Sequence, residues 1–419
     1  MNSHTISNCQ SCGSSKLKPR FFASYIPSVN VMQESNKPLA GQEFYPAQLL
    51  ECEECTLVQM GCIVDQHILF PPNYPYTSGT TKALRDNFKE LAYECKSLPI
   101  PVGSLVVDIG SNDNTLLEQF KWEFSQVWGL RLFGVEPTDT GKNRPVEGIK
   151  VNQRFFTEEE GEVIAFNHGK ANLITCCNCF AHMPDINDVL KGITYLLADD
   201  GIFVSESHYL PSLLKGLQYD VIYHEHLRFY SLTSLSHLLS QHGLNIIDAK
   251  EIPTHGGSIR VWAKRDGTMS KRALDLMLAE KESLSDERWK EFENKVGTSK
   301  LWLWRRLLDI SNNGYQAGLR GAAKIYGIGA PSRSTVLIHY LGMQDILDCV
   351  CEVPTSKKIG HFVPGTAIPI VDEECLYRDQ PEYAMLLSWH IADELIPKIR
   401  ERGFKNKFII PLPYPKVIE

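Results

Sequence analysis

Four titratable side chains stand in a row in the segment Tyr223-His224-Glu225-His226. Phenol, imidazole and carboxyl groups can exchange protons with a substrate, so the segment is a candidate acid–base cluster, with His182 as a neighbour expected near the same place. A zinc-protease site is disfavoured, because His224 and His226 are two residues apart and would diverge on a helix. On an extended segment the two histidines could bind a metal, although no third ligand is evident, or be hydrogen-bonded residues at a domain edge.

A second polar group follows a predicted strand in the run Asp108-Ile-Gly110-Ser-Asn112-Asp113. Gly110 lets the backbone approach a ligand closely, and Asp108 or Asp113 can accept hydrogen bonds from it. Only one glycine occupies the turn, which disfavours a pyrophosphate loop of the G-x-G-x-x-G type. The next strand ends in Glu136, about 26 residues later, where a carboxylate can bind both hydroxyls of a ribose. The set favours S-adenosylmethionine (SAM) over a nicotinamide cofactor, while a turn or helix-capping role stays open for Asp108.

Two CxxC pairs lie near the amino terminus, and their cysteines are Cys9, Cys12, Cys52 and Cys55. Four thiolates fill the tetrahedral shell of zinc and leave no position for a water or substrate, so the pairs predict a structural zinc site. Two disulfides or four unliganded core cysteines are the alternatives, and thiolate ligands alone do not exclude iron.

Composition indicates an ordinary soluble protein of two or three domains, with 419 residues, 43% hydrophobic and 22% charged. The formal net charge of -7 argues against a broad nucleic-acid-binding surface. The amino terminus lacks the basic start and apolar run of a signal peptide, and no apolar stretch approaches the length of a bilayer span. We expect a cytoplasmic monomer without nucleic-acid or membrane partners.

Short apolar runs alternate with helical patterns in two parts of the chain, separated by a charged helical segment without proline. This alternation predicts an α/β protein with two doubly wound parallel sheets, the second one smaller. The predicted parts are a zinc-binding module and extended strap at 1–80, an α/β domain with the cofactor turn at 81–267, a helical connector at 268–318, and a smaller α/β domain at 319–419.

Taken in order, these pieces resemble the sugar C-methyltransferases that act on nucleoside-diphosphate-linked 4-keto deoxyhexoses. The resemblance covers nearly the whole chain, and no single short motif decides it. The matching motifs are the two CxxC pairs, Tyr74-Pro-Tyr76-Thr-Ser78, Asp108-Ile-Gly-Ser-Asn-Asp113, Ala181-His182, Tyr223-His-Glu-His226, His255-Gly-Gly-Ser258, Tyr326-Gly-Ile-Gly-Ala-Pro-Ser-Arg333 and Pro364-Gly-Thr-Ala-Ile-Pro369.

The resemblance implies a class I SAM-methyltransferase domain followed by a Rossmann-like domain for the nucleotide sugar. It implies methylation of carbon 3 through proton abstraction and an enolate, with His226 as the base. Further groups expected around the keto-sugar are Tyr223, Glu225, Tyr76 and His182. The expected cofactor-binding residues are Asp108, Gly110, Asn112, Asp113 and Glu136. The expected substrate-binding residues are His224, His255, Gly329, Ser332 and Arg333.

Some residues depart from the pattern of the family. Asn114 stands where relatives commonly have glycine, although asparagine tolerates left-handed backbone angles. His390 and the pair Cys351-Glu352 lie in the expected nucleotide-sugar domain, so they bear on substrate identity more than on reaction type. The glycines near Gly329 could serve only tight packing, and 255–258 could be a simple turn. A non-catalytic binding module, a SAM-dependent enzyme with another acceptor and a nicotinamide-dependent sugar oxidoreductase are the competing functions.

Overall fold

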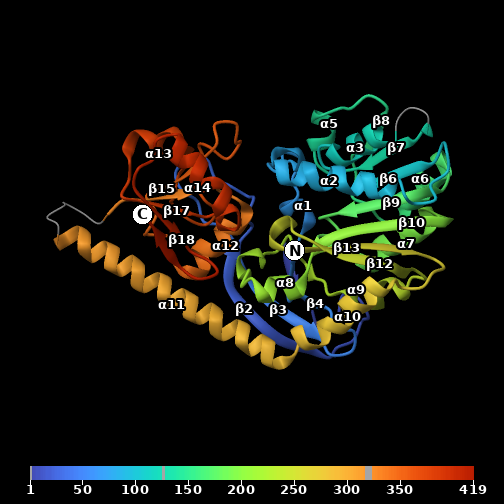
Figure 1. Cartoon of the computed structure of the whole chain (residues 1–419), viewed down its shortest axis with the longest axis horizontal. Coiled ribbons are helices and arrows are strands. Elements are labelled where there is room, and N and C mark those ends of the chain that lie inside the picture. Colours follow the sequence, from blue (N-terminus) through green and yellow to red (C-terminus); the bar gives the residue numbers. More distant parts are fainter. Residues whose placement is uncertain (1, 125–127, 317–322) are drawn as a thin grey trace.

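The computed structural model describes residues 2–124, 128–316 and 323–419, whose strands form four sheets (Figure 1). The predicted boundary between the connector and the last domain, at residues 318 and 319, lies outside these described residues. Among the described residues, no helix has the length and apolarity needed to cross a membrane.

The amino-terminal module contains two antiparallel sheets. Alternate residues of its long strands are buried, as in a sheet with one covered face. The larger sheet consists, in spatial order, of β11 (Arg228–Phe229), β4 (Val58–Met60), β3 (Phe44–Cys52) and β2 (Leu17–Pro27), and the smaller sheet pairs β1 (Ser3–Thr5) with β5 (Cys62–Val64). The short helices α1 (Gln66–Leu69) and η1 (Ser78–Thr80) follow this module.

The central domain has a seven-stranded sheet in which the five strands from β10 to β8 run parallel. β13 is antiparallel to its neighbours, and the first strand along the chain lies in the middle of the sheet. The spatial order is β12 (Asn245–Ile252), β13 (Ser258–Lys264), β10 (Leu197–His208), β9 (Ala171–Cys177), β6 (Leu105–Ile109), β7 (Arg131–Val135) and β8 (Ile149–Asn152).

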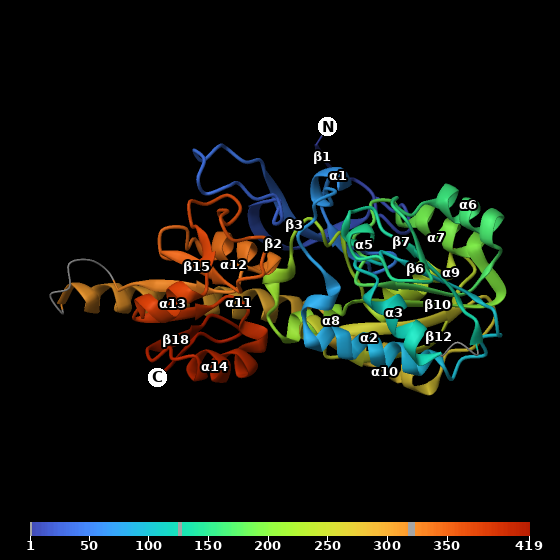
Figure 2. The same ribbon diagram turned by 90° about the horizontal axis from the view of Figure 1, so that it is seen from above.

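Helices cover both faces of the central sheet, as Figure 2 shows. One face packs against α2 (Lys82–Cys95) and α3 (Thr115–Glu123). The other packs against α6 (Glu158–His168), α7 (Ile186–Leu196) and α9 (Leu232–Ser240). Apolar residues on both faces explain the continuous hydrophobic runs of the strands. Shorter pieces near the carboxyl ends of the strands are α5 (Thr140–Asn143), α8 (Leu210–Lys215), η2 (Tyr219–Val221) and η3 (Thr254–Gly256).

Polar side chains cap the amino ends of α6 and α7. The side chain of Asp185 accepts hydrogen bonds from the amides of Asn187 and Asp188, and Thr157 accepts one from Glu160. Such caps satisfy amides that have no partner inside a helix. They determine where each loop at the carboxyl edge of the sheet ends and the helix begins.

The carboxy-terminal domain is a second doubly wound sheet, parallel except at its last strand. Its spatial order is β16 (Ile370–Asp372), β15 (Cys349–Glu352), β14 (Ile325–Ile328), β17 (Tyr383–Leu386), β18 (Lys407–Ile410) and β19 (Lys416–Ile418). The helices are α12 (Ser332–Leu341), α13 (Glu374–Asp379), η4 (Trp389–Ile391) and α14 (Ala392–Glu401). The observed α/β fold, with a smaller second sheet, confirms the predicted fold class.

Two helices, α10 (Lys271–Ser283) and α11 (Asp286–Gln316), link the two α/β sheets. Figure 1 shows α11 lying along the carboxy-terminal domain. Lys300 Nζ donates to the carbonyl of Tyr340 at 2.7 Å, and Trp304 Nε1 donates to that of Leu341, also at 2.7 Å. These bonds attach the long helix to the end of α12.

One hydrophobic core joins the amino-terminal sheet to the carboxy-terminal domain. Phe21, Ala47 and Val58 of the amino-terminal sheet pack in the same cluster as Val336 and Met385. The end of the module that carries the cysteine pairs packs instead into the core of the central domain. The amino-terminal module therefore lies between the two α/β sheets and contacts both.

A buried ion pair attaches α2 to the central sheet. Arg260 on β13 donates to Glu206 on β10 at 2.5 Å, and both side chains are fully buried. Arg260 also reaches Glu94 and the side chain of Asn87 on α2, at 2.5 and 2.9 Å. Burial raises the pKa of Glu206, which its bonds to Arg260 and Asn87 partly offset.

Replacing Arg260 by methionine leaves the carboxylate of Glu206 buried without its counter-charge. We expect the free energy of unfolding to fall by about 3–5 kcal/mol, measured by urea unfolding of the full chain. The double variant Arg260→Met/Glu206→Leu removes both charges and should regain most of that loss. Equal destabilisation of the two variants would contradict this account of the ion pair.

Candidate active site

The turn after β6 brings the backbone close to the neighbouring strand. Gly110 has φ +73°, and its amide donates to the carbonyl of Val135 at 2.8 Å. A Cβ at this position would lie 2.7 Å from both Cβ and Sγ of Cys179. Only glycine fits this turn, because a side chain would meet both the left-handed backbone angle and Cys179.

Glu136 lies where the sequence predicted it, beside that turn. Its Oε2 accepts from the amide of Asn112 at 2.9 Å, and its Oε1 from the amide and hydroxyl of Thr138 at 2.9 and 2.5 Å. Burial raises the pKa of Glu136, and these hydrogen bonds oppose the shift. Oε2 accepts only one of these bonds and has further acceptor capacity at the carboxyl edge of the sheet, which fits a ribose hydroxyl of SAM.

The other predicted cofactor residues have protein partners. Asp108 is buried and accepts from the hydroxyl of Thr175 at 2.6 Å, and burial raises the pKa of Asp108 to about 7. The side chains of Asn112 and Asp113 accept from the amides of residues 78 and 79 at 2.8 and 2.9 Å. They therefore hold the strap over the cofactor turn.

Four imidazole rings gather beyond the ends of β9, β10 and β12, and we call them the histidine cluster. The rings of His182 and His226 stack with centroids 5.0 Å apart, and that of His208 lies 4.7 Å from His226 and 5.6 Å from His255. The ring of Tyr223 lies 4.1 Å from that of His226. The structure thus brings His182, Tyr223, His226 and His255 together from three separate loops.

Hydrogen bonding defines the tautomer of His226. Its Nδ1 lies 2.6 Å from the carbonyl of Val221, which can only accept, so Nδ1 carries a proton and Nε2 keeps its lone pair when the ring is neutral. Burial lowers the pKa of His226 to about 4, the Val221 bond opposes this, and His255 and Arg333 lower the pKa further. His226 is therefore neutral near pH 7.

The two residues before His226 face other partners. Glu225 accepts from Asn30 Nδ2 at 2.7 Å and from the Tyr74 hydroxyl at 2.9 Å, and burial raises the pKa of Glu225 to about 7. His224 Nε2 lies 3.2 Å from the carbonyl of Pro46 on β3. His224 thus packs on the amino-terminal sheet, and the structure does not bring it to the histidine cluster.

Tyr76 lies on the strap, with 40% of its surface exposed. Burial of the phenol, together with the charge of Asp113, raises the pKa of Tyr76 to about 12. Burial raises the pKa of Tyr223, and the charges of Glu225 and Tyr76 add to this shift. Tyr76 is therefore close to both the cofactor turn and the histidine cluster.

Arg333 of the carboxy-terminal domain is held by a bidentate ion pair. Its Nε and a terminal nitrogen donate to the two oxygens of Asp220 at 2.8 and 2.7 Å, and both side chains are buried. Trp389 Nε1 donates to the same carboxylate at 2.7 Å. Burial lowers the pKa of His255 to about 4 and that of His390 to about 3. The charge of Arg333 contributes to both shifts.

The turn after β14 repeats the construction of the turn after β6. Gly329 has φ +80° and donates to the carbonyl of Cys351 at 2.9 Å. The amide of Ala330 donates to Glu352 at 2.6 Å, as that of Asn112 does to Glu136. The hydroxyl of Ser332 donates to Asn30 of the amino-terminal module at 3.2 Å.

Two residues of this region were missed from the sequence, His208 and Asp220, and Glu352 was noted only as a departure from the family pattern. His208 is a single histidine in a strand, which carries no pattern of its own, and Asp220 is recognisable only through Arg333. Glu352 had a usable signal, because it ends the second strand after a glycine turn, as Glu136 does.

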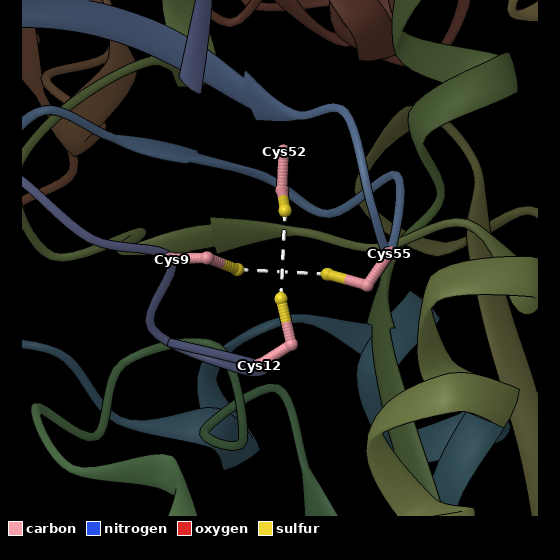
Figure 3. A group of neighbouring side chains, drawn as sticks. All are labelled: Cys9, Cys12, Cys52 and Cys55. Carbon is pink, nitrogen blue, oxygen red and sulfur yellow. Dashed lines mark hydrogen bonds between the residues drawn. The ribbon is translucent and has the colours of Figure 1, made fainter. Parts of the chain in front are cut away.

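The four amino-terminal cysteines converge on one point, as Figure 3 shows. The Sγ atoms of Cys9 and Cys55 are 3.5 Å apart, as are those of Cys12 and Cys52, and all four lie within 4.8 Å of one another. Tetrahedral zinc with bonds of about 2.3 Å places its sulfurs roughly 3.8 Å apart, so the donor set fits this metal. Within the described side chains, no other group of three or more histidines, cysteines and carboxylates has a geometry that could hold a metal ion. The histidine cluster does not have it either.

Two family models together match most of the chain. One, described as a methyltransferase domain, matches residues 76–249, and one described as a C-methyltransferase C-terminal domain matches residues 253–413. The chain is 32% identical over 99% of its length to C-methyltransferase NovU of Streptomyces niveus, of which it covers 97%. It is 27% identical over 35% of its length to ubiquinone biosynthesis O-methyltransferase of Colwellia psychrerythraea, of which it covers 63%.

Solved structures resemble less than half of the chain. An S-adenosylmethionine-dependent methyltransferase of Clostridium acetobutylicum has a TM-score of 0.33 and 14% identity, covering 45% of this chain and 94% of its own. The CcbJ methyltransferase of Streptomyces caelestis has a TM-score of 0.32 and 10% identity, covering 42% and 89%. These scores are low, so the fold assignment rests on the strand order and the methyltransferase family model.

Loss of a cysteine ligand should affect the histidine cluster more than the cofactor turn, because Cys55 closely precedes β4, which pairs with β11 just after His226. For Cys52→Ser we expect loss of bound zinc, measured by plasma mass spectrometry, and of methyl transfer, while SAM affinity changes by less than about tenfold. Cys62→Ser alters a buried cysteine of the same module that is not one of the four converging cysteines. This variant should retain both bound zinc and methyl transfer. Full zinc content in Cys52→Ser would contradict the assignment.

Alanine at Gly110 should weaken SAM binding by about tenfold or more, because the new Cβ displaces Cys179 and the turn. Gly103→Ala is the matched control, since Gly103 has φ +78° but open space around it, so both variants bear a similar backbone cost of about 1–2 kcal/mol. Calorimetric titration with SAM separates them. Equal affinities would show that the close approach at Gly110 does not shape the cofactor site.

Proposed function

Because the chain belongs to the sugar C-methyltransferase family, we propose that it methylates carbon 3 of a nucleoside-diphosphate-linked 4-keto-6-deoxyhexose. A ketone at position 4 acidifies the proton on carbon 3, and its removal gives an enolate whose carbon is a nucleophile. SAM supplies, when bound, an electrophilic methyl group on a sulfonium sulfur. The protein must therefore remove one proton, stabilise one developing oxyanion and hold two ligands in line.

His226 is the base in this proposal, and its tautomer is the observation that carries it. The bond from Nδ1 to Val221 leaves Nε2 as the proton acceptor. Its lowered pKa keeps the ring neutral, so it is ready to accept the proton near pH 7. A cationic His226 beside an anionic enolate forms an ion pair, whose attraction offsets the cost of charging a buried imidazole.

Tyr223 and Arg333 supply the groups that an enolate oxygen needs. The hydroxyl of Tyr223 has no protein hydrogen-bond partner among the described residues, and its ring lies against His226, so it is free to donate to the oxyanion. Arg333 adds a positive potential, reduced by Asp220, that already acts on His226 and His255. Pre-oriented donors and charges of this kind stabilise a transition state without reorganisation.

Glu225 and His182 orient the site. Both oxygens of Glu225 already accept hydrogen bonds from Asn30 and Tyr74, which supports a structural role between the strap and the histidine cluster. His182 stacks on the His226 ring and limits its rotation. Tyr76 faces the cofactor turn from the strap and helps to exclude water there.

In this proposal each of the two glycine turns holds one of the two ligands. Gly110 and Glu136 receive SAM, with Asp108 and the bonds from Asn112 and Asp113 shaping the turn. The matching construction at Gly329 and Glu352 supports binding of the nucleotide by the carboxy-terminal domain. His255 of the cluster, and Ser332 and Arg333 at the start of α12, are the proposed contacts to the diphosphate and sugar.

Asparagine at His226 keeps a donor for Val221 but has no basic nitrogen. We expect methyl transfer to fall by about 10²–10⁴-fold, with SAM affinity within about twofold of the wild type. The assay incubates the protein with SAM and a panel of thymidine, guanosine and uridine diphosphate 4-keto-6-deoxyhexoses, and follows the gain of one methyl mass.

His237→Asn is the control, because His237 is exposed on α9, away from the histidine cluster. It should turn over like the wild type. Normal turnover by His226→Asn would remove His226 as the base. No methyl gain by the wild type on any member of the panel would overturn the proposed substrate class.

A further inference from the structure

His208 has no task in the chemistry described so far, yet it lies inside the histidine cluster. It is the last residue of β10, and its ring is a direct neighbour of His226 on one side and of His255 on the other. In the described residues, neither of its nitrogens has a hydrogen bond to the protein. A half-exposed imidazole with both nitrogens free is equipped to accept a proton on one and release it from the other.

The reaction creates a proton that must leave the site. The electron pair of the C3–H bond becomes the enolate and then the new C–C bond, and the pair of the S–CH3 bond remains on sulfur. Each turnover thus leaves one proton on Nε2 of His226. The His226 side chain is only 5% exposed, and its Nδ1 faces the Val221 carbonyl, which cannot pass a proton on.

The rings around His226 are those of His182, His208, Tyr223 and Phe229, and in the proposed reaction the hydroxyl of Tyr223 donates to the enolate oxygen. The far side of His182 is covered by the stacked ring of Phe70, with centroids 5.8 Å apart, and Phe229 carries no ionisable group. His208 continues to His255, which is partly exposed in the turn η3 and whose Nε2 is buried without a hydrogen-bond partner in the described structure.

The charges around His208 disfavour a second proton on the histidine cluster. The titratable groups that act on its pKa are His182, His226, His255 and Arg333, and after burial all four lower it. Two protons on neighbouring rings, beside the positive Arg333, repel one another. The cluster therefore holds one proton at a time, and this proton must leave before the next one forms.

We propose that His208 is the relay that takes the C3 proton from His226 and passes it through His255 to water. The proton moves from Nε2 of His226 to one nitrogen of His208, either directly after the His208 ring rotates or through one water. It then leaves from the other nitrogen of His208. His208 does not touch the reacting carbon in this scheme, so it is a positioning residue for proton exit. The proposal rests on the proposed C3 methylation.

The test compares three rates in His208→Asn, which keeps a polar side chain that cannot carry a proton. They are methyl transfer in a single turnover with enzyme in excess, steady-state turnover, and loss of a C3 deuterium label to solvent without SAM. The substrate is the member of the nucleotide-sugar panel that the wild type methylates.

We expect single-turnover methyl transfer within about twofold of the wild type, because the base and donors are intact. Label loss and steady-state turnover should fall by about tenfold or more, since the label then returns to carbon 3 before it exchanges. Added imidazole should restore label loss, which it would not do for a variant that is merely misfolded. His237→Asn should match the wild type in all three rates.

Two results would overturn the relay. Unchanged label loss in His208→Asn would mean that the proton leaves by another route, and a parallel fall in single-turnover transfer would mean that His208 shapes the site instead. Failure of the proposed function would look different, because the wild type itself would then show neither methylation nor label loss.

Discussion

The loop that carries His226 is held by backbone hydrogen bonds to parts of the chain that are distant in sequence. The amide of Leu227 donates to the carbonyl of Ala181, and the amide of Met60 donates to the carbonyl of Leu227, both at 2.9 Å. The pairing of β11 with β4 continues this contact. Through these bonds, the loop of His182, the histidine cluster and the cysteine module form one unit, so the amino-terminal module helps to position the histidine cluster.

Electrostatic contributions to the site come from outside the central domain. Arg333 belongs to the carboxy-terminal domain, and its partner Asp220 precedes the loop that carries His226. The pair acts twice, because it joins two domains through a bidentate bond and places a partly neutralised cation beside neutral imidazoles. In the proposed reaction, a full positive charge there would make protonation of His226 harder, whereas no charge would remove one of the groups that stabilise the enolate.

The features predicted from sequence were those with a strong local constraint. The CxxC spacing predicted the cysteine cluster, and the turn and strand end predicted that Gly110 and Glu136 would meet. His224 shows the limit, because successive side chains of an extended segment point to opposite sides and only the fold decides which side faces the cluster. The long β2–β3 hairpin was missed because its two register shifts interrupt the alternation that marks a strand. His208 became recognisable only through three-dimensional proximity.

The pairing of β4 with β11 also has a consequence for biosynthesis. All four cysteines emerge from the ribosome with the first 55 residues, so metal can bind while most of the chain is unmade. The free edge of β4, however, has no partner until residues 228–229 have been translated. During that interval the nascent module exposes an unpaired strand edge of the kind that recruits other chains. The rate at which the central domain is synthesised therefore sets how long the first-made part of the protein stays vulnerable to aggregation.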